Sequence, residues 1–232
     1  MKSSLTLILA IFISSAFAQT AIKASEIIRQ IDDGQPVMYK NVEIEGVIDL
    51  TNLKNRREAN VSFEPFSFGN DVYESSVEVS IVFVNCTFQD DVIAYYNDDR
   101  SDDTFIAHFE EDVTFQNCTF KRASEFKYSE FEEKADFGGT TFNREANFKY
   151  AEFSDTPVFA NVNFRDDANF KYTEFPQGVN FESAVFEQLA NFKYTKFRTP
   201  LNLKNVAFNG EEDFKYTKVD GHSFTSYLLN SR

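Results

Sequence analysis

Phenylalanine recurs along the second half of the chain at a spacing that fits neither a helix nor a simple strand. An amphipathic helix needs apolar residues three and four apart, and a strand buried on one face needs them two apart. Here the steps alternate between six and five without a break, and Leu203, Phe208, Phe214 and Val219 continue the series. A chain that turns a corner every five or six residues fits this pattern. The Phe positions are 109, 115, 120, 126, 131, 137, 142, 148, 153, 159, 164, 170, 175, 181, 186, 192 and 197.

A small residue usually stands two positions before each large one. Two side chains of each unit therefore point inward, one small and one large, while polar side chains point outward. The small positions include Ala107, Val113, Cys118, Ser129, Ala135, Ala146, Ala151, Ala168, Ala184 and Ala190.

The chain also repeats itself every 22 residues. Ser-Glu-Phe-Lys-Tyr at 124–128 returns as Ala-Asn-Phe-Lys-Tyr at 146–150, 168–172 and 190–194, and as Glu-Asp-Phe-Lys-Tyr at 212–216. Steps of 11 residues do not share Lys-Tyr, so positions 22 apart have like environments. We expect one coil to contain 22 residues in four short faces, with five such coils between residues 109 and 219.

The recurring Ala-Asn-Phe-Lys-Tyr resembles the unit of the pentapeptide-repeat family, in which a small residue, Asp or Asn, and a central Leu or Phe precede two variable residues. The resemblance covers residues 109–219 strongly and about 42–94 weakly. It implies an all-β fold, a right-handed quadrilateral parallel β-helix (a solenoid). The family keeps a five-residue step, so two corners of each coil here must absorb an extra residue. A leucine-rich repeat is the nearest rival, but no Leu-x-x-Leu-x-Leu-x-x-Asn run is present.

The segments that flank the regular array differ from it in pattern. Near-helical spacing of isoleucines within residues 21–33, followed by Gly34, predicts a short N-terminal capping helix that covers the first edge of the solenoid. Open column ends favour edge-to-edge pairing, so an end-to-end dimer through a cap is one expected assembly. We divide the chain into a signal peptide (1–18), an N-terminal helical cap (19–40), irregular first coils (41–94), a polar loop insertion (95–108), the regular array (109–219) and a C-terminal cap (220–232).

Residues 1–18 are typical of a secretory signal. Lys2 supplies the positive charge, Leu5 to Ile13 the apolar stretch, and Ala16-Phe17-Ala18 the cleavage site. This predicts a secreted or periplasmic protein in an oxidising compartment, and the family resemblance favours a bacterial source. Loss of Lys2 would take the net charge from −14 to −15.

The acidic balance and the lack of long apolar runs exclude two classes of protein. The chain has 37 acidic and 23 basic residues, which argues against direct nucleic-acid binding. No apolar run after the signal approaches the roughly 18 residues that span a bilayer, so no membrane span is expected.

The Lys-Tyr pairs are the most site-like feature of the sequence. They are Lys127, Tyr128, Lys149, Tyr150, Lys171, Tyr172, Lys193, Tyr194, Lys215 and Tyr216. Stacked at strand spacing, the five tyrosines would form a flat amphipathic stripe about 19 Å long, a composition that favours protein interfaces and flat ligands such as glycans. A second column lies two residues beyond the tyrosines and contains Glu130, Glu152, Glu174, Lys196 and Lys218. The alternative is that the pairs record repeat duplication without selection for binding.

Cys86 and Cys118 stand in the matching contexts Val-Asn-Cys-Thr-Phe and Gln-Asn-Cys-Thr-Phe, 32 residues apart. That separation is one coil plus the ten-residue loop, which places both at small inward positions on adjacent coils. A disulfide is within geometric reach there. Two buried thiols are the favoured alternative, because side chains on adjacent parallel strands point the same way.

Residues that would carry catalysis or bind a metal are sparse. Asp98, Asp99, Asp102 and Asp103 lack the spacing and Gly of a calcium-binding EF-hand loop, and we interpret them as a solvated loop. His108 and His222 have no companion residues in the sequence. We expect no catalytic residue, metal or cofactor.

These observations favour a non-enzymatic, secreted β-helix that serves as a structural or protein- and surface-recognition module. Its partner would be an unknown protein or a cell-surface glycan. The family resemblance suggests an alternative, an acidic rod that mimics DNA and inhibits a DNA-binding protein such as gyrase; the charge agrees with this role, but the signal peptide does not. A further alternative is a polysaccharide-binding or polysaccharide-active β-helix, for which no acid–base pair is visible.

Overall fold

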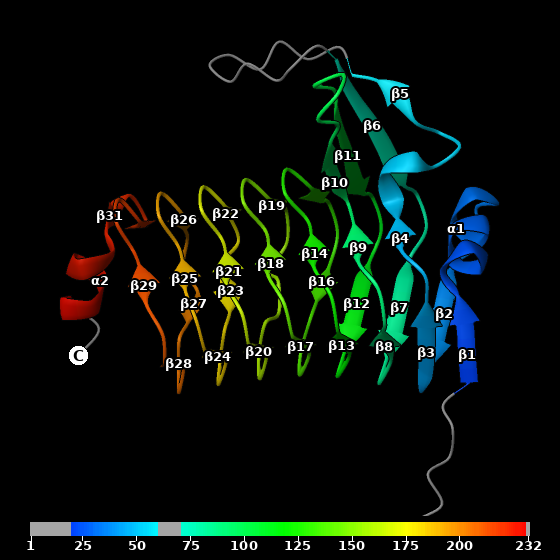
Figure 1. Ribbon diagram of the computed structural model, residues 1–232. Coiled ribbons are helices and arrows are strands. Elements are labelled where there is room, and N and C mark those ends of the chain that lie inside the picture. The colour runs from blue at the N-terminus through cyan, green and yellow to red at the C-terminus, as the bar shows by residue number, and fades with distance from the viewer. Residues whose placement is uncertain (1–19, 60–70, 231–232) are drawn as a thin grey trace, which may run out of the picture.

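The computed structural model describes residues 20–59 and 71–230, so the expected signal peptide lies outside the described residues. The described chain forms a column of stacked coils whose walls are parallel sheets (Figure 1). The predicted all-β fold, a right-handed β-helix, is confirmed.

Four faces make up the wall, and the chain visits them in the order B, A, C, D in each regular coil. Face A contains β1 (Thr20–Lys23), β3 (Val42–Glu45), β8 (Thr87–Phe88), β13 (Thr119–Phe120), β17 (Thr141–Phe142), β20 (Asn163–Phe164), β24 (Val185–Phe186) and β28 (Ala207–Phe208). Face B contains β2 (Val37–Lys40), β7 (Ile81–Val84), β12 (Val113–Gln116), β16 (Ala135–Asp136), β23 (Val179–Asn180) and β27 (Leu201–Asn202), with Val158 bridging β16 to β23.

The other two faces complete each coil. Face C contains β4 (Ile48–Asp49), β9 (Val92–Ile93), β14 (Ser124–Glu125), β18 (Ala146–Asn147), β21 (Ala168–Asn169), β25 (Ala190–Asn191) and β29 (Glu212–Asp213). Face D contains β5 (Arg57–Glu58), β6 (Val72–Val77), β10 (Tyr95–Asn97), β11 (Thr104–Phe109), β15 (Glu130–Phe131), β19 (Glu152–Phe153), β22 (Glu174–Phe175), β26 (Lys196–Phe197), β30 (Lys218–Val219) and β31 (His222–Ser223).

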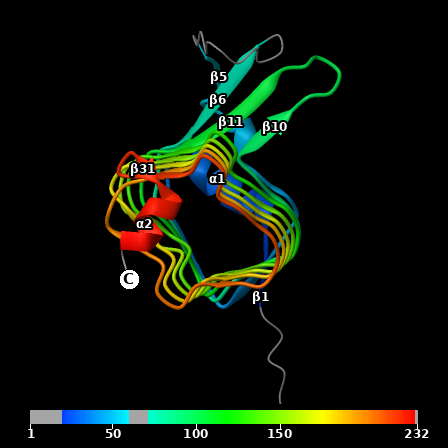
Figure 2. The ribbon, with the colours of Figure 1, turned by 90° about the vertical axis from the view of Figure 1, so that its left-hand side faces the viewer.

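The core consists of phenylalanine columns that run along the axis of the solenoid. Figure 2 shows the stacked coils viewed along this axis. Residues 22 apart are direct strand partners, as Phe109 and Phe131 show. Rings within a column are stacked; Phe148 and Phe170 have centroids 5.1 Å apart and planes 4° apart. Rings of neighbouring columns meet edge to face, as Phe148 and Phe159 do at 5.4 Å and 81°. This arrangement satisfies the preferred geometry of aromatic pairs in two directions.

The two kinds of step correspond to two kinds of corner. At the five-residue corners, between faces B and A and between faces C and D, the chain makes a hydrogen-bonded turn with one residue in the left-handed region. The six-residue steps fall at the other two corners, between A and C and between D and B, which absorb the extra residue. Corner type therefore alternates around each coil.

Threonine replaces alanine at several inward positions without leaving its hydroxyl unpaired. Thr173 Oγ1 donates to Phe148 O at 2.7 Å, and Thr195 Oγ1 donates to Phe170 O at 2.6 Å. Each bond reaches the preceding coil, so the small column gains a polar tie between coils.

The N-terminal cap differs from its predicted boundaries. The helix α1 (Ala24–Asp32) begins three residues later than residue 21, and β1 and β2 on either side of it are strands of the solenoid. Among the described residues, strands of the β-helix are therefore present from Thr20 onward, before residue 41. Ile22, counted among the helical isoleucines, instead pairs with Ile44 of β3. A short isoleucine-rich run fits both periods, and pairing with a later strand decides between them. The 3-10 helix η1 (Leu50–Asn52) follows β4.

Residues 95–108 are not a polar loop. Strands β10 and β11 pair antiparallel as a hairpin, and β11 pairs along its full length with β6, so that these strands project from the column (Figures 1 and 2). The polar residues 98–103 that dominate this stretch form the tip of the hairpin. Ala107 pairs with Ser75, which lies 32 residues away in the sequence. Local composition does not report such pairing.

At the C-terminal end, β31 folds back on β30 and leads into α2 (Phe224–Asn230). The ring of Phe224 stacks 4.2 Å from that of Phe214, at the end of a phenylalanine column.

Candidate functional site

Each Lys-Tyr pair occupies a tight corner between faces C and D. In the coil of Phe170, the amide of Thr173 donates to Phe170 O at 3.1 Å and closes a β-turn. Asn169 Oδ1 accepts from the amide of Lys171 at 3.2 Å, which fixes the entry to the turn. The third residue of the turn, Tyr172, has φ of 63°. Positive φ at this position is what a type II turn requires.

All five tyrosines share this backbone conformation, with φ between 60° and 65°. The equivalent residues at the corner between faces B and A are Asn117, Gly139, Asn161, Ser183 and Asn205. Glycine and asparagine are the residues that the left-handed region tolerates best, whereas a bulky side chain there costs about 1–2 kcal/mol. Five successive coils therefore place tyrosine where local backbone energetics disfavour it.

The five tyrosines and their preceding lysines form a continuous ladder, which we call the Lys-Tyr ladder. Ring centroids of successive tyrosines lie 4.6–4.8 Å apart, and the planes of Tyr150 and Tyr172 differ by 2°. Each lysine Nζ lies 4.9–5.6 Å from the centroid of its own tyrosine. Cation–π contacts and ring stacking thus offset the backbone cost.

Tyr95 of β10 meets the N-terminal end of the ladder. Its ring lies 5.8 Å from that of Tyr128, and its hydroxyl accepts a hydrogen bond from Lys127 Nζ at 2.8 Å. The sequence predicts neither contact, because Tyr95 falls in the segment interpreted as a loop.

The ladder differs from the flat stripe that the sequence predicts. Rings at strand spacing turn parallel and stack on one another, so their faces are occupied by neighbouring rings. Tyr216 ends the stack and is 57% exposed. The ladder consequently forms a ridge of ring edges, and its C-terminal end leaves one ring more open.

Burial and like charges set the electrostatics of the ladder. Burial lowers the pKa of Lys127, and burial with the charges of Lys127 and Lys171 lowers the pKa of Lys149. Burial also raises the pKa of Tyr128 and of Tyr150. Lysines repeated at strand spacing repel one another, which lowers the cost of accepting a negative group beside them.

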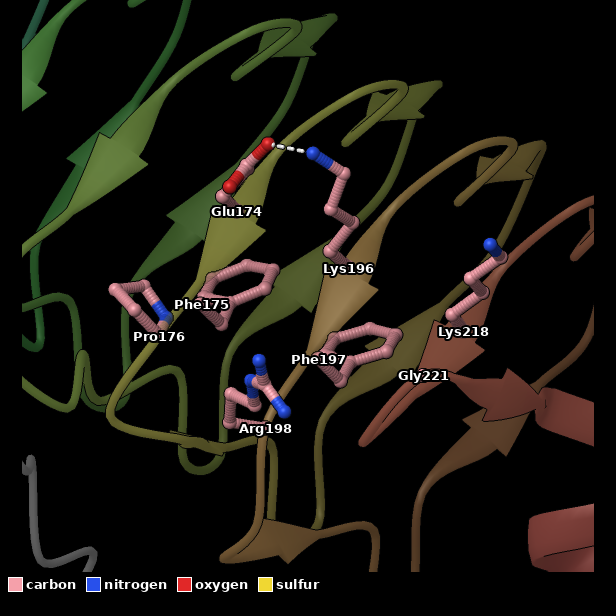
Figure 3. A pocket seen from close by; sticks show the side chains of 8 residues that line it. All are labelled: Glu174, Phe175, Pro176, Lys196, Phe197, Arg198, Lys218 and Gly221. Carbon is pink, nitrogen blue, oxygen red and sulfur yellow. Dashed lines mark hydrogen bonds and ion pairs between the residues drawn. The ribbon is translucent and has the colours of Figure 1, made fainter.

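The Glu-Lys column, defined as Glu130, Glu152, Glu174, Lys196 and Lys218, runs beside the ladder on face D. Glu174 and Lys196 form an ion pair where the column changes sign. A pocket of about 220 Å³ opens at this point (Figure 3). Its lining residues are Glu174, Phe175, Pro176, Lys196, Phe197, Arg198, Lys218 and Gly221. Sequence reasoning identified the column but not the pocket, which three coils build together.

Cys86 and Cys118 are free and buried. The expected adjacency holds, because the flanking residues Thr87 and Thr119 are direct strand partners. Cys118 Sγ lies 3.4 Å from Phe83 O, and Cys86 Sγ lies 3.5 Å from Tyr39 O, so each thiol contacts a backbone carbonyl. The hydrogen bond to Cys86 and burial raise the pKa of Cys118. The pair fills two small slots of the core as thiols.

The acidic residues at 98–103 form the tip of the β10–β11 hairpin. Asp98 Oδ1 accepts from the amides of Arg100 and Ser101 at 2.8 and 3.3 Å, and these bonds lower the pKa of Asp98. The Asp98 carboxylate therefore stabilises the turn in which it lies. Within residues 20–59 and 71–230, no group of three or more His, Cys, Asp or Glu side chains is placed to hold a metal ion.

The projecting strands also carry an aromatic cluster that sequence reasoning missed. The ring of Phe105 stacks 5.1 Å from Tyr73 and 5.8 Å from Tyr96, and the guanidinium of Arg56 lies 5.4 Å from the centroid of Phe105. These residues fall outside the regular spacing, so no repeat signal marks them.

Over the described part of the chain, no helix has the length and apolar character needed to cross a membrane. Residues 107–152 and 148–196 match the family model described as pentapeptide repeats (9 copies). No curated protein and no solved structure matches the chain. Proteins of this family are generally structural or protein-interaction modules and generally not enzymes. The matched residues span the regular coils from β11 to β26, and this match together with the right-handed solenoid identifies these coils as pentapeptide repeats.

Proposed function

We propose that the protein is a non-enzymatic recognition module that binds a protein or a cell-surface glycan through the Lys-Tyr ladder. The observation that carries this proposal is the left-handed conformation of all five ladder tyrosines. Strain maintained at the same place in successive coils points to a role for the side chains themselves. Simple duplication would reproduce the residues, but the opposite corner was duplicated too and holds Asn, Gly and Ser.

The character of the surface supports binding rather than catalysis. The ladder presents amphipathic rings and ammonium groups on a rigid wall, a composition enriched in recognition surfaces. Rigidity matters because ordering a flexible surface on binding would cost free energy.

The proposed place of action is outside the cytoplasm. Lys2, the apolar stretch from Leu5 to Ile13 and the Ala16-Phe17-Ala18 site support secretion to the periplasm or the medium. The thiol state of Cys86 and Cys118 agrees with either compartment, because both side chains are buried from oxidants.

Affinity capture from cell envelope and culture medium tests the role of the ladder. The bait is the mature chain, compared with a Tyr150→Asn, Tyr172→Asn and Tyr194→Asn variant; Asn suits the same backbone conformation, so the coil is kept. A matched control carries Asn161→Gly and Asn205→Gly at the opposite corner. We expect a partner to be retained by the wild type and the control and lost by the tyrosine variant. Equal recovery by all three baits would reject the ladder as the binding surface.

The acidic charge favours a second candidate, a DNA-mimic inhibitor of a DNA-binding protein such as gyrase. That role requires an uncleaved chain in the cytoplasm. Cell fractionation with N-terminal sequencing separates the two: a chain that begins at Gln19 outside the cytoplasm supports the recognition module, and an intact cytoplasmic chain supports the inhibitor.

A further inference from the structure

The last two regular coils gather positive charge on face D and its two corners. The cations are Lys193, Lys196, Arg198, Lys215 and Lys218. In the earlier coils the Glu-Lys column places Glu130, Glu152 and Glu174 beside the ladder lysines and offsets their charge. In these two coils the column itself is basic. A chain of net charge −14 thus carries a local excess of positive charge at one end of one face.

The cations of this end are incompletely paired. Lys196 and Lys218 are direct partners on the neighbouring strands β26 and β30, an arrangement in which like charges destabilise a sheet. Lys196 reaches Glu174 of the preceding coil. Within the described ranges, neither Arg198 nor Lys218 makes an ion pair. The nearby carboxylate of Asp220 accepts a hydrogen bond from the backbone amide of Thr199 at 3.2 Å, so it is engaged by the backbone of this corner.

The pocket of about 220 Å³ lies among these cations. Figure 3 shows Arg198 just after strand β26 and Lys218 on the neighbouring strand β30, with Phe197 between them in this view. Pro176 lies beside Arg198, and the Glu174–Lys196 ion pair lies on the other side of the Phe175 and Phe197 rings. Tyr216, which is 57% exposed, precedes Lys218 by two residues and ends the ring stack. An anionic group in the pocket and a flat ring at the end of the ladder would therefore be bound side by side.

We propose that this end of face D binds a carboxylate-bearing sugar of an acidic polysaccharide. Arg198 and Lys218 contact the carboxylate through charge-assisted hydrogen bonds, and the open ring of Tyr216 packs against a sugar ring. The proposal rests on the recognition role proposed above and names one ligand class for it.

Isothermal titration with trigalacturonate tests the assignment, and maltotriose serves as a neutral trisaccharide control. The variant is Arg198→Glu with Lys218→Glu. A matched variant, Lys121→Glu with Arg165→Glu, makes the same change of net charge at exposed positions that do not line the pocket. Tyr216→Asn tests the ring, and circular dichroism checks that each chain is folded.

We expect the wild type and the matched variant to bind trigalacturonate alike, more weakly at high salt, and to ignore maltotriose. The Arg198 and Lys218 variant should lose affinity about tenfold or more, since hydrogen bonds between charged groups are the strong ones. Absence of binding by the wild type, equal binding of maltotriose, or equal losses in both charge-reversal variants would overturn the site. If trigalacturonate fails while the tyrosine ladder still captures a partner, the recognition role stands and this ligand class is wrong.

Discussion

At the scale of single residues, two inward positions and one corner position define each repeat. The large residue is a phenylalanine buried on all sides, and the small one leaves room for the rings of adjacent columns. The corner residue must adopt positive φ, which asparagine or glycine does at little cost. Tyrosine at that place on one side of the solenoid is the departure that marks the ladder.

The buried phenylalanines carry most of the stability of the column. Phe170 is fully buried and stacks 5.1 Å from both Phe148 and Phe192. Phe170→Ala is expected to lower the free energy of unfolding by about 3–5 kcal/mol. Lys171→Ala, one position along and on the outside, should cost less than about 1 kcal/mol. Denaturant titration of both variants measures the difference, and equal losses would contradict the assignment of inward and outward positions.

The opposite corner offers a direct test of the balance between strain and stacking. Asn161→Tyr alone should lower stability by about 1–2 kcal/mol, because the ring has no stacking partner there to offset the left-handed backbone. Adding Ser183→Tyr in the next coil places two rings at strand spacing. The double variant is expected to lose about 0.5–1.5 kcal/mol less than the sum of the single variants. Strict additivity in a double-mutant cycle would show that stacking does not compensate for the strain.

At the scale of the strand, the regular register places residues 22 apart side by side. A residue type repeated at that spacing therefore forms a column of like side chains. A column of phenylalanine or tyrosine gains stacking, whereas a column of one charge accumulates repulsion. Glu130, Glu152 and Glu174 are successive partners on face D and show this cost. Burial, together with the charges of Glu130 and Glu174, raises the pKa of Glu152.

This raised pKa predicts how acid affects the column. As the pH falls, Glu152 takes up its proton at a higher pH in the folded chain than in the unfolded chain. The contribution of Glu152 to stability is therefore greatest below its pKa in the unfolded chain, and it is lost as the pH rises through its pKa in the folded chain. Glu152→Gln should therefore raise the melting temperature at pH 7 and flatten its change towards about pH 4.5. The gain should stay below about 1 kcal/mol because water screens the site. Glu187→Gln, on another corner, is the control. If Glu152→Gln does not raise the melting temperature at pH 7 above that of the control, the predicted repulsion within the glutamate column is excluded.

At the scale of the whole molecule, the two ends of the column are covered differently. Helix α1 buries Ala24, Ile27 and Ile31 at the N-terminal end. At the other end, β28 and β29 are the last strands of their sheets, and Leu203 and Phe208 are only partly buried. A sheet edge in this state favours pairing with another edge.

We therefore expect the mature chain to form an end-to-end dimer through its C-terminal coil. Ala207→Arg places a long charged side chain in the last strand of face A and should give a monomer. Glu187→Arg, on the wall one coil earlier, should leave the dimer intact. Sedimentation equilibrium distinguishes the two variants, and a wild type that remains monomeric at tens of micromolar would rule out this assembly.

The sequence by itself determined the solenoid, the 22-residue coil and the identity of the inward residues from 109 to 219. It could do so because each coil contacts only its neighbours, so a local spacing of apolar residues is repeated as the global structure. The alignment of Tyr128 through Tyr216 in one column and the adjacency of Cys86 and Cys118 follow from the same register.

Only the tertiary structure decided the features that depend on pairing between dissimilar segments. Ile22 joins a strand because it faces Ile44, and residues 95–108 form a hairpin because β11 pairs with β6. The positive φ of the ladder tyrosines and the pocket beside Arg198 likewise could not be predicted from the sequence. Backbone conformation at a corner and the meeting of side chains from three coils depend on how the coils stack, and no spacing of residues along one coil encodes that geometry.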